Sequence, residues 1–330
     1  MPIEDFITSF PAPLELGNSI DHWKYEDLTR TLGRVYNGID LAEVLNAPNA
    51  DELLRDLAIT ISHRGVVVFR DQKNLTADQQ KFFTHRLGQL TGKPEESGIH
   101  IHPINHTVHK EGEKPDLEMS TIARNPENML SKQSGVVTGK KTLKKQSVAD
   151  GWHSDIAFER ITSDYTTLIN KVRPSTGGDT VFASAHEVYD RISPPWRAFL
   201  ETLTGTFSPG HPQNVDQSLT AEHPIVRTNP VTGWKSIFGV GHHLQTVNGL
   251  APDESEHIKS YLMKLITDNH DLQARVKWEV NDLAVFDNRA VYHTATYDYD
   301  EPRVCLRVVA VGEAPALDPK GVSRSDALDL

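Results

Sequence analysis

Hydrophobic and polar residues repeat with two different periods along the chain, and the first of these periods is helical. Residues 51–64 carry apolar side chains at helical spacing, and residues 65–70 form an almost continuous apolar run typical of a short buried strand. A second helix is expected over residues 76–90, because Thr76 and Gln79 have the spacing of a capping box. This part of the chain is therefore predicted to be helical, with one buried strand between its helices.

After residue 160 the apolar residues gather in short strand-like runs separated by turn-rich segments. These runs are residues 165–172, 179–184, 223–228, 235–240, 283–288 and 303–311. Helical patterns at 193–203 and 252–270 are insertions between some of the runs and do not follow every strand. That order favours antiparallel strands over regular βαβ units. We predict a mainly β fold with flanking helices, a double-stranded β-helix of the jelly-roll, cupin-like type.

Two glycine-containing segments between these runs are expected to form tight turns. They are residues 174–180 (PSTGGDT) and residues 229–236 (NPVTGWKS). In each case a hairpin between consecutive strands is the simplest structural expectation.

The net charge of −11 disfavours nucleic acid and acidic membrane surfaces as partners. Cys305 is the single cysteine, which excludes an internal disulfide, and the sequence shows neither a leader pattern nor a long apolar span. We therefore expect a cytoplasmic protein with no membrane partner. The sequence leaves open whether the protein forms a homo-oligomer.

The candidate chemistry begins at His153 and Asp155, which would share one face of an extended backbone. Apolar residues flank this pair, and His293 stands between two strand-like runs much later in the chain. Two imidazoles and one carboxylate can occupy one face of a metal octahedron and leave the opposite face for a chelating cosubstrate and dioxygen, as in non-haem Fe(II) oxygenases. The same set also binds zinc, so a zinc hydrolase is an alternative.

Other histidines are weaker candidates for a metal site. His109 and Glu111 lie in the charged stretch HKEGEK, which is typical of a solvated loop. His100 and His102 lack acidic partners at close spacing, so a second metal site is not predicted there. His242 and His243 adjoin in a glycine-rich turn, where a surface position and a pocket position are both open.

Arg303 and Arg307 are four positions apart on a predicted strand, so both would point the same way, together with Cys305. Burying two guanidinium groups side by side is costly unless anions meet them. Arginine binds carboxylates, sulfonates and phosphates through two parallel hydrogen bonds. A pocket for two anions is therefore one interpretation, and an arginine face exposed to solvent is the other. A non-catalytic protein that binds small anions also stays open.

Three segments of the chain resemble the signature segments of the taurine/2-oxoglutarate dioxygenase family (TauD/TfdA), in the same order and at similar spacing. They are WHSDIAF, VRPSTGGDTVFAS and DNRAVYHTATYDYDEPRVCLRVVAVGE. The similarity extends from about Gly65 to Glu313. It implies an enzyme that uses Fe(II), 2-oxoglutarate and O2 to oxidise a small anionic organic substrate, releasing succinate and CO2.

The resemblance also implies roles for individual residues. His153, Asp155 and His293 would be the iron ligands. Thr180 and Arg303 would hold the distal carboxylate of 2-oxoglutarate. Arg307 would bind the anionic end of the substrate, and His102 and Asn105 would line the substrate pocket.

This chain departs from the taurine-specific members of the family at three places in the pocket. Asn105 stands where those enzymes carry a tyrosine, Ala149 stands where they carry an asparagine, and a pocket phenylalanine is replaced near His243. The expected substrate is therefore a sulfonate, a sulfate ester or an amino or carboxylic acid, with taurine in doubt. A taurine-type sulfonate dioxygenase that releases sulfite is the alternative.

The length of the chain and one long polar stretch indicate how its domains are organised. A chain of 330 residues with 38% hydrophobic content can bury a large core, and barrel-like folds of this length commonly form one domain. We expect a single domain over residues 1–330 with a helical N-terminal extension. The long polar stretch 107–150 leads into the metal motif and is predicted to be a lid, with disorder as the alternative.

Overall fold

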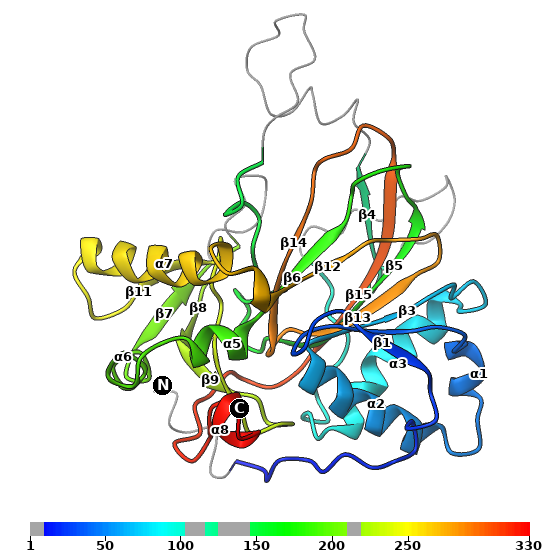
Figure 1. The fold of residues 1–330 in the computed structure, drawn as a ribbon, viewed down its shortest axis with the longest axis horizontal. Coiled ribbons are helices and arrows are strands. Elements are labelled where there is room, and N and C mark those ends of the chain that lie inside the picture. The colour runs from blue at the N-terminus through cyan, green and yellow to red at the C-terminus, as the bar shows by residue number, and fades with distance from the viewer. Residues whose placement is uncertain (1–9, 103–115, 125–145, 210–218) are drawn as a thin grey trace, which may run out of the picture.

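The computed structural model describes residues 10–102, 116–124, 146–209 and 219–330, and a seven-stranded sheet is its largest element (Figure 1). In spatial order the strands are β1 (Tyr25–Asp27), β2 (Arg34–Tyr36), β3 (Val66–Phe69), β13 (Leu283–Asp287), β5 (Ser163–Val172), β15 (Arg303–Val311) and β4 (Ser120–Arg124). Neighbouring strands are antiparallel except for β2 and β3, which are parallel. The predicted strands at 65–70, 165–172, 283–288 and 303–311 all belong to this sheet.

A second, three-stranded sheet packs against the inner face of the first. It consists of β12 (Gln273–Val276), β6 (Thr180–Ser184) and β14 (Val291–Ala295), in that order. Phe182 of β6 and Phe286 of β13 contact each other, with their ring centroids 5.2 Å apart, in a buried cluster that also holds Leu168 and Cys305. The space between the two sheets is therefore an apolar core, and the candidate site lies at one end of it.

Two helices cover the outer face of the large sheet, α2 (Ala50–Arg64) and α3 (Ala77–Leu90), and the short helix α1 (Leu41–Leu45) lies beside them (Figure 1). The predicted capping box is present, because the Gln79 amide donates to Thr76 Oγ1 at 3.2 Å and the Thr76 amide donates to Gln79 Oε1 at 3.0 Å. Tyr165 and Ile169 of β5 pack toward these helices, so the alternate residues of β5 face the inner core.

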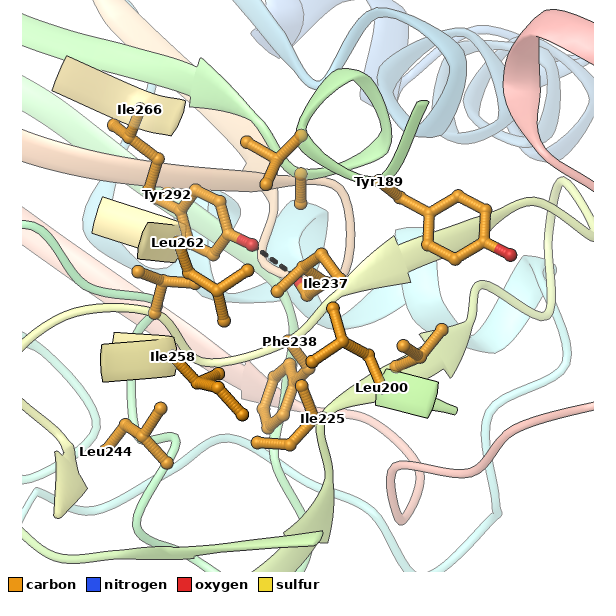
Figure 2. Packing of buried hydrophobic residues seen from close by; sticks show 14 of the residues in the cluster. Tyr189, Leu200, Ile225, Ile237, Phe238, Leu244, Ile258, Leu262, Ile266 and Tyr292 are labelled. Atoms are coloured by element: carbon orange, nitrogen blue, oxygen red, sulfur yellow. Dashed lines mark hydrogen bonds between the residues drawn. The ribbon is translucent and has the colours of Figure 1, made fainter. Parts of the chain in front are cut away.

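The remaining strands and helices form a second apolar cluster on the other side of the molecule. The strands are β7 (Thr204–Phe207), β8 (Ala221–Pro224), β9 (Val226–Thr228), β10 (Lys235–Ile237) and β11 (Leu244–Val247), and the helices are α5 (Ala185–Asp190), α6 (Pro194–Leu200) and α7 (Pro252–Thr267). Figure 2 shows Ile258, Leu262 and Ile266 of α7 in this cluster with Tyr292 of β14, whose hydroxyl donates to the Ile237 carbonyl. A short 3-10 helix (His270–Leu272) and the C-terminal helix α8 (Arg324–Ala327) complete the chain.

The two turn predictions have different outcomes. Residues 229–236 form the predicted hairpin, which joins the antiparallel pair β9 and β10. Residues 174–180 do not form a hairpin, because they carry the chain from β5 in the large sheet to β6 in the small one. Gly177 and Gly178 in this crossing have φ of +72° and +69°, a conformation that glycine adopts without strain.

The expected N-terminal extension and lid are only partly within the described residues. Residues 10–48 contribute β1 and β2 to the large sheet as well as α1. Within the stretch 107–150, residues 120–124 form the edge strand β4, while residues 107–115 and 125–145 lie outside the described part. The lid and the single domain therefore stay predictions. No helix in the described ranges is long and apolar enough to cross a membrane.

Candidate active site

An isolated backbone bridge brings the two separated parts of the predicted metal motif together. The His153 amide donates to the His293 carbonyl at 3.1 Å, and the His293 amide donates to the His153 carbonyl at 2.9 Å. Asp155 lies two residues further along, and the ligand atoms of His153, Asp155 and His293 are all within 4.8 Å of one another. The prediction that these three side chains form one cluster is confirmed.

The geometry and chemistry of this cluster suit a metal ion. Ligand atoms about 2 Å from one ion can be separated by up to about 4 Å, so small movements of the side chains bring all three into range. His153 Nδ1 lies 2.8 Å from the Gly151 carbonyl, which fixes the ring and leaves Nε2 toward Asp155, 3.8 Å from Oδ1. The His293 ring packs against Phe182 and Phe286, and its Nδ1 is buried with no hydrogen-bond partner in the described residues. Two imidazole nitrogens and one carboxylate oxygen form a donor set that accepts Fe(II).

Two residues that the sequence did not reveal hold Asp155 in place, one at its backbone and one at its carboxylate. The Asp155 amide donates to Asn288 Oδ1 at 2.9 Å, and the Thr166 hydroxyl donates to Asp155 Oδ2 at 3.0 Å. Asn288 Nδ2 in turn donates to Thr166 Oγ1 at 2.9 Å. Asn288 follows directly on β13 and Thr166 lies on the inner face of β5, but only the packing of these strands brings them to Asp155.

Burial and neighbouring charges prepare these groups as ligands. Burial opposes ionisation of Asp155, but the Arg307 guanidinium outweighs it, with help from the Thr166 hydrogen bond, and holds the pKa of Asp155 well below its usual range. Burial lowers the pKa of His153, and His293 and His242 lower it further; burial also lowers the pKa of His293. A carboxylate and two neutral imidazoles are the protonation states that bind a metal.

The two arginines of β15 lie on the inner face, as one of the two interpretations predicted. Arg303 is 3% exposed, and Arg307 Nη1 donates to Asp155 Oδ1 at 2.7 Å. Leu306 between them packs toward the helices of the outer face. The solvent-facing alternative is therefore wrong.

Arg303 lies beside Thr180 at the end of the crossing from β5 to β6. Arg303 Nε donates to the Gly178 carbonyl at 2.8 Å, and its Nη2 is 3.5 Å from Thr180 Oγ1. Thr180 Oγ1 also accepts from Trp278 Nε1 at 3.1 Å, so its own hydroxyl proton is left to donate elsewhere. Among the described residues, no carboxylate forms an ion pair with Arg303. The buried Arg303 guanidinium and the Thr180 hydroxyl thus lie side by side, and no carboxylate of the described residues pairs with the guanidinium.

A row of rings connects His102 to the metal cluster. The His102 ring lies 6.2 Å from Phe158, Phe158 lies 5.2 Å from His243, and His243 lies 5.9 Å from His153. The His242 ring is 5.0 Å from His153. His243 is buried beside His153, whereas His242 is exposed, and Asn105 lies outside the described residues.

The backbone of Gly241 packs tightly against the segment that carries His153. A Cβ on Gly241 would come within 1.9 Å of the Trp152 carbonyl, and its φ is +116°. Outside this contact is a groove of about 320 Å³, lined in part by Ala149, Leu244 and Met263. Ala149, one of the departures from the taurine-specific pattern, therefore shares the lining of this groove with Gly241.

Comparisons with known proteins agree with this geometry. A family model described as "Taurine catabolism dioxygenase TauD, TfdA family" matches residues 24–309. The alpha-ketoglutarate-dependent dioxygenase btcD of Neocamarosporium betae is 42% identical, over 96% of this chain and 98% of its own. An alpha-ketoglutarate-dependent sulfonate dioxygenase of Saccharomyces cerevisiae is 29% identical, over 92% of this chain and 70% of its own. The crystal structure of a taurine dioxygenase from Burkholderia xenovorans has a TM-score of 0.67 and 25% identity, covering 91% of this chain and 94% of that one.

The chain belongs to the TauD/TfdA family, and the resemblance of its signature segments to that family is confirmed. It is an alpha-ketoglutarate-dependent dioxygenase, with Fe(II), 2-oxoglutarate and O2 as cofactors. The mainly β, jelly-roll class is confirmed by the two packed sheets and by the solved relative. A zinc hydrolase and a non-catalytic binding protein are set aside.

Proposed function

We propose that His153, Asp155 and His293 hold Fe(II). The observation that carries the proposal is the bridge between His153 and His293, which places the three ligand atoms within 4.8 Å of one another beside Arg307. Thr166 bonds the Asp155 carboxylate, Asn288 accepts from the Asp155 backbone amide, and the Gly151 carbonyl fixes the His153 ring. When bound, Fe(II) supplies the oxidation chemistry that the side chains cannot perform, with 2-oxoglutarate leaving as succinate and CO2.

Thr180 and Arg303 are proposed to hold the distal carboxylate of 2-oxoglutarate. The Arg303 guanidinium is buried, has no carboxylate partner among the described residues, and keeps N–H groups free for one. The Trp278 N–H occupies the Thr180 oxygen, which turns the hydroxyl proton toward other acceptors. A charge-assisted pair in this buried position would orient the cosubstrate at the metal.

Arg307 is proposed to bind the anionic end of the primary substrate. Its Nη1 bonds Asp155, and its Nε is buried without a partner, so hydrogen-bonding capacity remains next to the metal ligands. His102 and Asn105 are proposed to line the same pocket. The yeast relative is named for sulfonates, and we propose a sulfonate, a sulfate ester or an amino or carboxylic acid as the substrate class. The changes at Asn105, Ala149 and His243 would make taurine a poor substrate.

A substrate screen tests this proposal. Succinate release from 2-oxoglutarate would be measured with alkyl sulfonates, sulfate esters and α-amino acids, for the wild type and for Arg307→Ala. We expect one small organic anion to be turned over better than taurine, and Arg307→Ala to lose that preference because the arginine no longer pairs with the anion. Taurine as the best substrate would contradict the altered specificity. Unchanged turnover in Arg307→Ala would contradict the role of the arginine.

A further inference from the structure

Asn170 is a buried amide whose hydrogen-bonding groups are unused. It is fully buried in β5, and neither its Nδ2 nor its Oδ1 has a hydrogen-bond partner in the described part of the chain. Buried side-chain amides are normally paired, because they lose their bonds to water on folding. Asn229, another fully buried amide, shows the usual pattern, since its Nδ2 donates to Asp287 at 3.0 Å and its Oδ1 accepts from the Val231 amide at 2.9 Å. The unpaired Asn170 amide therefore requires an explanation.

The strand pairing places Asn170 in the space between the two sheets. Side chains two positions apart on a strand share a face, so Asn170 points the same way as Thr166 and Leu168. Thr166 on that face bonds Asp155, and Leu168 packs in the cluster that holds Phe182. Asn170 therefore belongs to the inner row of β5 that begins at the metal cluster.

The same pairing places Asn170 beside the proposed cosubstrate pocket. Asn170 is the direct partner of Cys305 on β15, and directly opposite residues of an antiparallel pair project their side chains from the same face. Cys305 lies on the inner face with Arg303, two residues away, whose guanidinium has no carboxylate partner among the described residues. An amide that can donate and a guanidinium that can donate thus stand on the inner faces of neighbouring strands, and both are buried.

A second unpaired group lies close to the same place. Tyr299 is 8% exposed, and its hydroxyl has no hydrogen-bond partner within the described ranges. Burial raises the pKa of Tyr299, and the guanidinium groups of Arg303 and Arg124 oppose that rise. Arg124 and Arg303 are direct partners in the pairing of β4 with β15. Asn170 and Tyr299, two of the buried polar groups without partners, therefore both lie near Arg303.

We propose that Asn170 is a further cosubstrate-binding residue, whose amide Nδ2 donates to the distal carboxylate of 2-oxoglutarate together with Arg303 and Thr180. The proposal rests on the proposed function of Arg303 and Thr180. A carboxylate has room for several donors, and Arg303 and Thr180 leave part of that capacity unfilled. The unpaired amide of Asn170 would then lower the stability of the ligand-free protein and raise the affinity for 2-oxoglutarate.

Calorimetric titration of the Mn(II)-loaded protein with 2-oxoglutarate tests this proposal without turnover. Asn170→Leu keeps the size of the side chain and removes its polar atoms. We expect its affinity for 2-oxoglutarate to fall about tenfold or more, the usual effect of losing a hydrogen bond to a charged group. The affinity for 2-oxopentanoate, which lacks the distal carboxylate, should be the same in both proteins. Because the variant buries no unpaired amide, its unfolding midpoint without ligand should equal or exceed that of the wild type.

Equal affinity for 2-oxoglutarate in the wild type and Asn170→Leu would overturn the proposal. An equal loss for 2-oxoglutarate and 2-oxopentanoate would overturn it as well, because the effect would then come from packing. Should leucine prevent folding, Asn170→Ala removes the same amide without adding volume and is judged by the same criteria. A wild-type protein that fails to bind 2-oxoglutarate would instead contradict the function proposed for Arg303 and Thr180.

Discussion

Two buried aspartate–arginine pairs lie close together in this fold, and they differ in how completely they are satisfied. Asp287 accepts bonds from the Arg289 backbone and guanidinium, from the Ser62 hydroxyl and from Asn229, and both side chains of the pair are at most 2% exposed. Asp155 accepts from Arg307 and Thr166, and the Arg307 side chain is 16% exposed. The first carboxylate has its acceptor capacity filled, whereas the second keeps capacity directed at two imidazoles.

Asn288 joins the two pairs, because it follows Asp287 in the chain and accepts from the Asp155 amide. The same short segment therefore contains a structural ion pair and a residue that positions a metal ligand. The contrast indicates how the protein separates stability from function. The saturated Asp287–Arg289 pair joins elements of the core, whereas the incompletely satisfied Asp155 and Arg307 lie where metal and substrate are expected to bind.

The largest effect should come from breaking the saturated pair. Asp287→Asn leaves the Arg289 cation buried with poorer partners and should cost about 3–5 kcal/mol in the free energy of unfolding. Asp155→Asn should cost less, because Asp155 accepts fewer hydrogen bonds than Asp287 and the Arg307 side chain keeps some contact with solvent. Urea denaturation of the metal-free variants measures both values. Equal losses would remove the distinction between the two pairs.

A second large effect is expected at Arg303, the cation without a carboxylate partner among the described residues. Arg303→Leu removes the proposed partner of the cosubstrate carboxylate, which should raise the Michaelis constant for 2-oxoglutarate by about 30-fold or more. Arg303→Lys keeps the charge without the two-pronged geometry and should lie between the leucine variant and the wild type. Steady-state succinate release over a range of 2-oxoglutarate concentrations gives the comparison. An unchanged constant in Arg303→Leu would refute the assignment.

A smaller effect concerns a third buried carboxylate, Asp164, which is poorly paired. Its Oδ2 has no hydrogen-bond partner in the described residues and lies 4.0 Å from Lys93 Nζ, and burial raises the pKa of Asp164 to about 7 despite Lys93 and Arg289. The folded state therefore holds this proton more tightly than the unfolded state, where the pKa is about 4. The contribution of Asp164 to stability should fall as the pH rises from about 4 to about 7.

Asp164→Asn removes this titration. The difference in unfolding free energy between the variant and the wild type should shift in favour of the variant over that pH interval. Thermal denaturation at several pH values between 4 and 8 provides the measurement. A constant difference across the interval would show that Asp164 has an ordinary pKa.

The sequence was most informative where chemistry depends on local spacing. His153 and Asp155, two positions apart, lie in one cluster as their spacing predicted, and Thr76 with Gln79 forms the capping box because both partners lie within one helical turn. Strand periodicity assigned Arg303 and Arg307 to one face of the strand. It did not decide whether that face is buried or exposed to solvent.

The long-range arrangement could not be predicted from local pattern. Residues 174–180 have the composition of a hairpin, yet they cross between sheets, because the partners of β5 are β13 and β15, both more than a hundred residues away. No sequence motif marks Thr166, Asn170 or Asn288. Their positions follow only from the register of β5 with its neighbours. Trp278 is similar, since its role depends on a contact with Thr180 across the core.

Anaerobic Fe(II) titration of His293→Ala tests the metal site most directly, with the wild type beside it and circular dichroism to confirm that the variant folds. The wild type should bind one equivalent of Fe(II). The variant should keep its fold and bind at least about 100-fold more weakly, because one of three ligands is gone from a site whose other two are held by their own neighbours. Wild-type affinity in the folded variant would contradict the assignment of His153, Asp155 and His293 as the iron ligands.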